Sequence, residues 1–110
     1  MEEKTFQFAK ATAFFTKKFP NTPSNKEYIS QVIRSSGSTG ANYIEANEAL
    51  SKKDFAMKVK ICRREAKESI FWLRLLIETN SEDFKQAGSV LRNEATELKK
   101  IFSAIISKSS

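Results

Sequence analysis

The stretch that decides the fold is "RSSGSTGANY", Arg34 to Tyr43, which combines two glycines with a run of hydroxyl side chains. This composition is typical of a flexible loop or of a phosphate-binding turn. The spacing around it is that of a helix, because one stripe of residues recurs at intervals of 3, 4, 3, 4, 3 and 4. A loop would not keep the residues after it in phase with those before it, so the stretch is predicted to lie inside one long helix. The stripe consists of Ile29, Val32, Ser36, Thr39, Tyr43, Ala46 and Leu50.

The two glycines of the stretch need a reason to be inside a helix, since each costs about 1 kcal/mol relative to alanine. Small residues let a neighbouring helix approach closely. Gly37 and Gly40 are therefore predicted to be a site of close helix packing. A phosphate-binding loop is not favoured, because no lysine follows Gly40 and no strand precedes Gly37.

The same periodicity predicts three further helices outside this stretch. The four predicted helices cover residues 3–18, 25–49, 52–79 and 82–107, within a single domain of residues 1–110. The third carries an inner stripe of Phe55, Val59, Cys62, Ala66, Ser69, Leu73 and Leu76. Because the connections are short, successive helices are expected to pack antiparallel. The predicted fold is an all-α, up-down four-helix bundle.

Prolines and capping residues indicate where the predicted helices begin and end. Prolines at 20 and 23 disfavour helix in the residues before them. Ser24 and Glu27 have the spacing of a capping box and are predicted to open the second helix. Ser51 is the expected cap of the third helix, and Asn80 or Ser81 that of the fourth.

The composition narrows the class of protein. No run of about 18 apolar residues is present, so no membrane span is predicted. The opening "MEEKTFQFAK" begins with acids and lacks the basic region and apolar run of a secretory signal. The single cysteine, Cys62, excludes an internal disulfide and fits a reducing compartment. We expect a cytoplasmic protein without a membrane partner.

Positive charge is concentrated on the third predicted helix. The chain carries a net charge of +6, and residues 52–67 hold seven bases and two acids, 7 − 2 = +5. The bases Lys53, Lys60, Arg64 and Lys67 share one helix face and are the candidate nucleic-acid-binding residues. The alternative interpretation is a solvated helix face whose charge serves solubility.

The end of the third helix is too apolar for a bundle that covers one stripe of each helix. In "IFWLRLLI", residues 70–77, every residue except Arg74 is apolar. A helix that is apolar all round must be buried on more than one side. Self-association is the simplest explanation, with a groove for another protein's helix as the alternative. The candidate interface residues are Tyr43, Phe71, Trp72 and Leu75.

No catalytic constellation is recognisable. The chain has no histidine, which removes the commonest general base and metal ligand. Glu65 and Glu68 form an E-x-x-E pair that Glu45 could face, but pairing with Arg64, Lys67 or a neighbouring chain is favoured over metal binding. Cys62 lies on the apolar stripe and is expected to be a small core residue. We predict a non-enzyme with no catalytic residues, no metal and no cofactor.

Several short motifs in the middle of the chain resemble a known family. Residues 32–79 follow, in order, the pattern "RS-small-GANY-x-EA", "SK-x-DF" and "EA-x-E", then an aromatic-rich "WL-x-LL". This pattern is similar to that of the four-helix bundle proteins also called 23S rRNA intervening-sequence proteins. The chain departs from it at Ile44 and Glu48, where relatives often carry basic residues.

The resemblance implies an antiparallel bundle that assembles into a cyclic homopentamer. Related bundles are basic accessory subunits of diversity-generating retroelements, where they associate with a reverse transcriptase and nucleic acid. The leading hypothesis is therefore a non-catalytic, ring-forming scaffold whose basic face binds RNA or DNA, with a role as accessory subunit of a nucleic-acid enzyme such as a reverse transcriptase as one form of it. The alternative is a protein-interaction adaptor that binds no nucleic acid.

Overall fold

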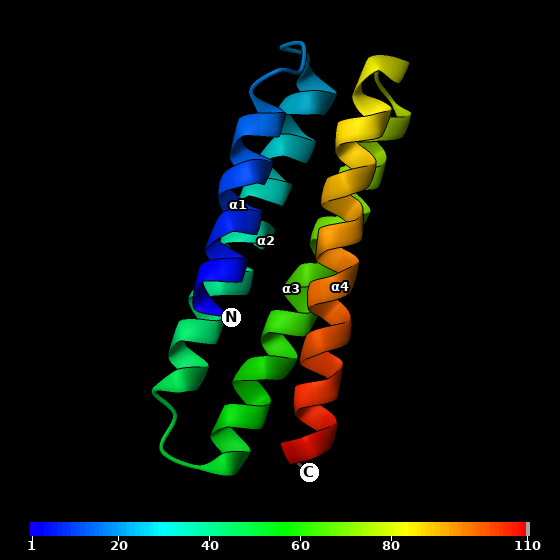
Figure 1. The fold of residues 1–110 in the computed structure, drawn as a ribbon. Coiled ribbons are helices and arrows are strands. Elements are labelled where there is room, and N and C mark those ends of the chain that lie inside the picture. The colour runs from blue at the N-terminus through cyan, green and yellow to red at the C-terminus, as the bar shows by residue number, and fades with distance from the viewer. Residues whose placement is uncertain (110) are drawn as a thin grey trace.

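The computed structural model describes residues 1–109, which form four α-helices and one short 3-10 helix (Figure 1). Helix α1 spans Glu2–Thr16, α2 Pro23–Asn47 and α3 Lys52–Glu78. The 3-10 helix η1, Glu82–Phe84, leads directly into α4, Lys85–Ser109. The helices lie side by side in a bundle whose principal extents are 45 × 20 × 19 Å. The predicted all-α four-helix bundle is confirmed.

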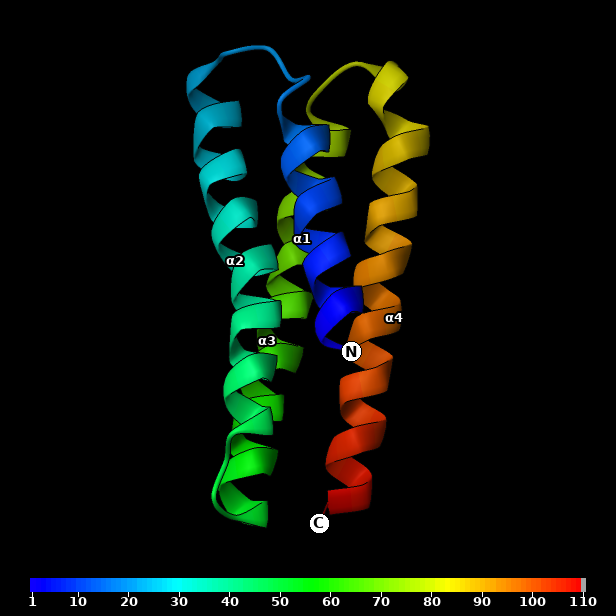
Figure 2. The same ribbon diagram turned by 60° about the vertical axis from the view of Figure 1, so that its left-hand side comes forward.

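The chain reverses direction at each connection, as Figures 1 and 2 show. Lys58, near the start of α3, contacts Glu45 near the end of α2. Trp72, near the end of α3, lies beside Tyr28 near the start of α2. Helix α1 is the shortest of the four, with 15 residues against 27 in α3. It therefore covers only part of the bundle's length, and the end away from it consists of α2, α3 and α4 (Figure 2).

Helix α2 runs without a break through the serine- and glycine-rich stretch. All residues from 34 to 43 are helical, and no residue of the described chain has a positive φ. Ser35, Ser36 and Thr39 are buried, and their hydroxyls donate to backbone carbonyls three or four residues earlier. These back-bonds satisfy polar groups that burial would otherwise penalise. The prediction of one long helix is confirmed.

The start of α2 differs from the predicted capping box. The cap is Thr22, whose side chain accepts a hydrogen bond from the backbone N–H of Asn25, and Pro23 occupies the first helical position. Proline suits that position because its missing N–H would be unpaired there anyway. The prediction of Ser24 as the cap was therefore wrong. Ser51 caps α3 as predicted, by accepting from the N–H of Asp54.

The predicted stripe of α2 ends before Leu50. The helix stops at Asn47, and Leu50 is 100% exposed in the connection to α3. The spacing continued by chance into a residue that no longer lies on a helix. Leu50 was thus wrongly included in the core.

The core is formed by the inner stripes of the four helices. Cys62, Ala66 and Leu73 of α3 are fully buried, as is Phe102 of α4. Phe55, at the start of the α3 stripe, is half-buried. The buried apolar side chains are Phe8, Phe15, Phe19, Val32, Ala46, Val59, Cys62, Ala66, Leu73, Leu76, Ile77, Leu91, Ala95, Leu98 and Phe102.

Two groups of contacts tie together the end of the bundle where α1 meets α2 and α3 meets α4. Phe19 stacks on Phe84, with ring centroids 4.0 Å apart, and both contact Phe15 edge-on. The side-chain amides of Asn25 and Asn80 donate to each other, at 2.9 and 2.8 Å. The amide pair joins the start of α2 to the connection that follows α3.

Candidate nucleic-acid interface

The solvent-facing side of α3 carries a second stripe, opposite the buried one. Its residues recur at intervals of 4, 3, 4, 3, 4 and 3, and each lies two positions before a residue of the inner stripe. Two helical positions are about 200°, so the two stripes point in opposite directions. All seven residues are exposed. This outer stripe of α3 consists of Lys53, Met57, Lys60, Arg64, Lys67, Phe71 and Arg74.

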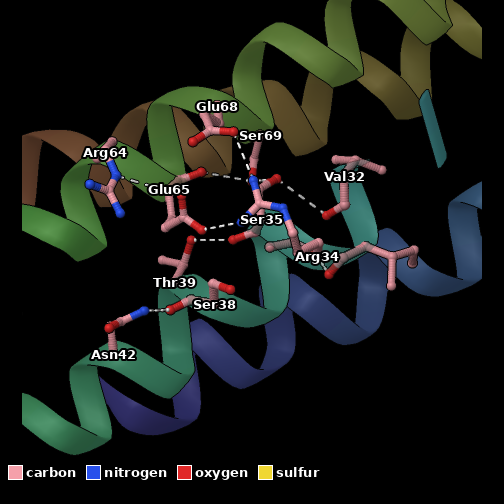
Figure 3. Close-up of polar contacts among 12 residues, drawn as sticks. Val32, Arg34, Ser35, Ser38, Thr39, Asn42, Arg64, Glu65, Glu68 and Ser69 are labelled. Atoms are coloured by element: carbon pink, nitrogen blue, oxygen red, sulfur yellow. Dashed lines mark hydrogen bonds and ion pairs between the residues drawn. The ribbon is translucent and has the colours of Figure 1, made fainter. Parts of the chain in front are cut away.

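Two acids of α3 that adjoin this stripe are paired with a cation from another helix. Arg34 of α2 donates from Nη1 to Oε2 of Glu65 at 2.6 Å and from Nη2 to Oε1 of Glu68 at 2.8 Å (Figure 3). The Glu65 side chain is only 4% exposed. The hydrogen bond to Glu65, together with the charges of both carboxylates, raises the pKa of Arg34. Arg34 therefore provides a charged partner for a largely buried carboxylate.

The same seam between α2 and α3 continues through neutral hydroxyls. The side chains of Ser35 and Ser69 share a hydrogen bond of 2.8 Å, and Ser69 also bonds to the carbonyl of Glu65 (Figure 3). These short side chains bring α2 and α3 close enough for Arg34 to reach across. Ser35 of the "RSSGSTG" stretch thus lies in the same seam as the ion pair.

Since Arg34 occupies both carboxylates, the cations of the outer stripe stay largely uncompensated. Among residues 1–109, neither Lys53, Lys60 nor Lys67 forms an ion pair. Arg64 lies 3.9 Å from the far oxygen of Glu65, at the limit of an ion pair. The four sequence-predicted nucleic-acid-binding residues therefore lie together, exposed, on one face.

The stripe ends at an exposed ion pair. Arg74 donates from Nε to Glu78 at 2.8 Å, one helical turn further along α3. This hydrogen bond raises the pKa of Arg74 and lowers that of Glu78. The positive charge available to a ligand thus decreases beyond Phe71.

The predicted interface residues do not form one cluster within the chain. Phe71 and Trp72 are in edge-on contact, with ring centroids 5.0 Å apart, and Leu75 follows one turn later. Phe71 is 56% exposed, whereas Trp72 is half-buried beside Tyr28. Tyr43 lies near the opposite end of α2 and contacts Phe102 of α4.

The two glycines of the stretch have different surroundings. A Cβ at Gly40 would lie 3.0 Å from Oγ1 of Thr5, so Gly40 lets α1 approach α2 closely. A Cβ at Gly37 would meet no described atom within 4 Å, so within one chain Gly37 makes no close helix contact.

A second exposed surface lies over α1 and α2 and is apolar. A groove of about 260 Å³ runs between the helices, with Phe6 on one side and Ile44 on the other. Phe6 is 59% exposed and Ile44 52%. Gly37, Gly40 and Ala41 form the α2 side of the groove. We call this surface the α1–α2 patch.

Three observations on residues 1–109 concern the cysteine, metal ligands and membrane-spanning helices. Burial raises the pKa of the Cys62 thiol to about 12, so at neutral pH it is protonated and a poor nucleophile. The described residues contain no group of three acidic, cysteine or histidine side chains that could hold a metal ion. No helix in that range is long and apolar enough to cross a membrane.

Comparison with known families matches almost the whole of this bundle. The family described as "23S rRNA-intervening sequence protein" matches residues 1–104. The chain belongs to the 23S rRNA-intervening sequence protein family. The match includes the outer helices, beyond the middle of the chain where the sequence motifs lie.

A solved member of the S23 ribosomal protein family has the same fold as this 23S rRNA-intervening sequence family chain. It is a protein of unknown function from Bacteroides thetaiotaomicron, 33% identical, with a TM-score of 0.83. The similarity covers 96% of each chain. No curated protein matches the chain. The comparisons therefore identify the family and the fold and assign no activity.

Sequence reasoning found four cations of the outer stripe but did not place Met57, Phe71 and Arg74 with them. The signal was present, because all seven residues follow the same 4 and 3 spacing. It was obscured because Phe71 lies within an apolar run and was grouped with Trp72. The pairing of Glu65 and Glu68 with Arg34 was also missed, since the sequence separates Arg34 from Glu65 by 31 positions.

Proposed function

We propose that this chain is a non-catalytic scaffold that binds nucleic acid through the outer stripe of α3. The observation that carries the proposal is the pairing of Arg34 with Glu65 and Glu68, which leaves Lys60 and Lys67 uncompensated. Five of the seven positions of the stripe are cationic and none is acidic. A row of uncompensated cations attracts phosphates and releases the counterions around them. The proposed setting is the cytoplasm.

We further propose that several copies form a cyclic assembly, a pentamer as the family resemblance implies. Five chains would carry 5 × 6 = +30. A ring would repeat the outer stripe around one axis, so that weak contacts act together. Such an assembly could serve as an accessory subunit that holds nucleic acid for an enzyme such as a reverse transcriptase.

We assign self-association to the α1–α2 patch rather than to Phe71 and Trp72. Trp72 already packs on Tyr28, and Phe71 lies among cations that would repel a like-charged face. The patch is apolar and exposed, and Gly37 leaves room for an approaching helix. Phe6→Glu with Ile44→Glu should convert the assembly to smaller species in light scattering. If the wild type is a monomer at micromolar concentration, the ring part of the proposal fails.

Salt-dependent binding to RNA and DNA of arbitrary sequence tests the nucleic-acid part. If about five phosphates are contacted, the logarithm of affinity should fall with the logarithm of salt with a slope of about −4 to −5 for duplex DNA. Replacing Lys60, Arg64 and Lys67 with glutamine should reduce the slope to about −2. Binding should not depend on base sequence, since phosphate contacts carry no sequence information.

A matched control distinguishes the effect of the outer-stripe cations from the effect of the net charge of the protein. Lys10, Lys26 and Lys100 are exposed on α1, α2 and α4. Replacing these three with glutamine removes the same charge and should change the slope much less than the stripe variant. Equal effects of the two triple variants would refute the location of the site on the outer stripe. No binding by wild type at low salt would favour the alternative of an adaptor that binds no nucleic acid.

A further inference from the structure

Phe71 is an exposed aromatic ring set into the row of cations. It is 56% exposed, with Lys67 one turn before it and Arg74 one turn after it on the same face of α3. Its ring meets Trp72 nearly perpendicularly, with an interplanar angle of 84° and centroids 5.0 Å apart. Trp72 in turn lies 6.1 Å from Tyr28. The ring of Phe71 is thus held by contact with Trp72, which itself packs beside Tyr28.

The charges near Phe71 are unequal on its two sides. Toward the start of α3 lie Lys67, Arg64 and Lys60, of which the two lysines have no acidic partner among residues 1–109. Toward the end of α3, Arg74 is paired with Glu78. A polyanion would therefore follow the stripe from Lys60 and reach Phe71 at the end of the positively charged segment.

The combination of uncompensated cations with an exposed, supported aromatic ring is suited to single-stranded nucleic acid. In a single strand, bases are free to stack on aromatic side chains, and each such stack contributes about 1–3 kcal/mol. In a duplex the bases are already stacked and paired, so an exposed phenylalanine adds little to binding. Cations alone would not produce a preference for the single strand, because the duplex has the higher density of phosphate charge.

Resting on the proposed nucleic-acid function, we infer that the ligand of the outer stripe is single-stranded RNA or DNA, with one base stacked on Phe71. The backbone lies along Lys60, Arg64 and Lys67. From Lys60 to Phe71 the helix advances about 16 Å, which is long enough for several nucleotides. Met57, 56% exposed at the other end of these cations, offers a second apolar contact.

The test compares three probes on the intact protein: a DNA strand of about twenty nucleotides, the RNA of the same sequence, and the duplex of the DNA strand with its complement. Wild type should bind the single strands more tightly than the duplex. Phe71→Leu should weaken single-strand binding about 5- to 150-fold, the equivalent of about 1–3 kcal/mol. It should leave duplex binding and the salt slope unchanged. Comparison of the affinities for the DNA strand and the RNA strand shows which of the two the outer stripe prefers.

Two further variants keep the test specific. Phe71→Tyr retains an aromatic ring and should retain most of the single-strand affinity. Phe14→Leu is the matched control, because Phe14 is also 56% exposed and has a lysine, Lys17, 5.1 Å from its ring on α1. It should bind all three probes as wild type does. Fluorescence of Trp72, the only tryptophan, should change with the single strands and not with the duplex.

Several results would overturn the inference. One is equal binding of Phe71→Leu and wild type to single strands, and another is an equal loss for duplex and single strands. A change of oligomeric state in Phe71→Leu would show that Phe71 is a contact between copies instead. If the stripe variant still loses its salt slope while Phe71→Leu is neutral, the proposed function stands and this inference fails. If no probe binds to wild type at low salt, both fail.

Discussion

Three helical glycines allow the packing of the bundle to be tested by the same substitution in three surroundings. Alanine is favoured over glycine inside a helix by about 1 kcal/mol wherever its methyl group fits. At Gly37 the new Cβ would meet no described atom within 4 Å. At Gly40 it would lie 3.0 Å from Oγ1 of Thr5, and at Gly88 it would overlap with Cγ1 of Ile77.

The expected magnitudes follow from these distances. Gly37→Ala should stabilise by about 0.5–1 kcal/mol, because only the helical preference changes. At Gly40 the buried Thr5 must move by a few tenths of an ångström, and overpacking of about 1–3 kcal/mol should cancel or exceed the gain. Gly88→Ala should be the most destabilising, by about 1–2 kcal/mol net, since Ile77 must change its side-chain conformation beside Phe15.

Urea unfolding followed by circular dichroism measures this order. The spread between Gly37→Ala and Gly88→Ala should be about 1.5–3 kcal/mol, or roughly 10 °C in Tm. The reasoning is refuted if the three variants are equally stable, or if Gly37→Ala is as destabilised as Gly88→Ala at every protein concentration. A loss at Gly37 that appears only at high concentration would instead place another copy of the chain against it.

Three further predictions concern the ion pair, the thiol and the amide pair. Arg34→Met should destabilise the protein by about 1–3 kcal/mol in urea unfolding, because it leaves the buried carboxylate of Glu65 without its partner. Adding Glu65→Gln to this variant should restore part of the lost stability. If the effects of the two substitutions are fully additive, the two side chains are not coupled. Burial raises the pKa of Cys62 to about 12, so as the pH rises the thiol ionises in the unfolded chain before it ionises in the folded one. The free energy of unfolding should therefore fall from about pH 9 toward pH 12, and this part of the fall should be absent in Cys62→Ala. Rapid alkylation of native Cys62 at pH 8 would show that the thiol is not buried. Asn25→Ala should destabilise by about 1–2 kcal/mol, because it removes the amide partner of Asn80, whereas Asn21→Ala in the exposed connection should be nearly neutral by the same measurement.

The helices could be predicted from the sequence because their buried stripes repeat with few interruptions. The phase from Val32 to Ala46 determined that the glycine-rich stretch is helical, and Ser51 marked the start of α3. The prediction was wrong at Leu50, where the apolar spacing continues beyond the last residue of the helix. It was also wrong at the start of α2, where both Thr22 and Ser24 are suitable cap residues. Periodicity describes one helix at a time and does not show where it ends.

The candidate site was predicted only in part for a related reason. The exposed face of α3 follows from spacing alone, so its lysines were found. Whether those lysines are neutralised depends on Arg34, which comes from another helix. Likewise, the contact between Gly40 and Thr5 joins residues 35 positions apart. To predict contacts between helices, one must know how each helix is rotated about its axis. That rotation is set by packing rather than by local sequence.

The amide pair of Asn25 and Asn80 has a consequence for how the bundle opens. Together with the rings of Phe19 and Phe84, it joins all four helices at one end. At the other end, where residues 48–51 connect α2 to α3, the helices continue past the start of α1 and Leu50 contributes no burial. Fluctuations should therefore begin at residues 48–51 and at the end of α4. In native-state hydrogen exchange, backbone amides near Ser51 should exchange through local fraying. Those near Asn25 and Asn80 should exchange only when the whole chain unfolds.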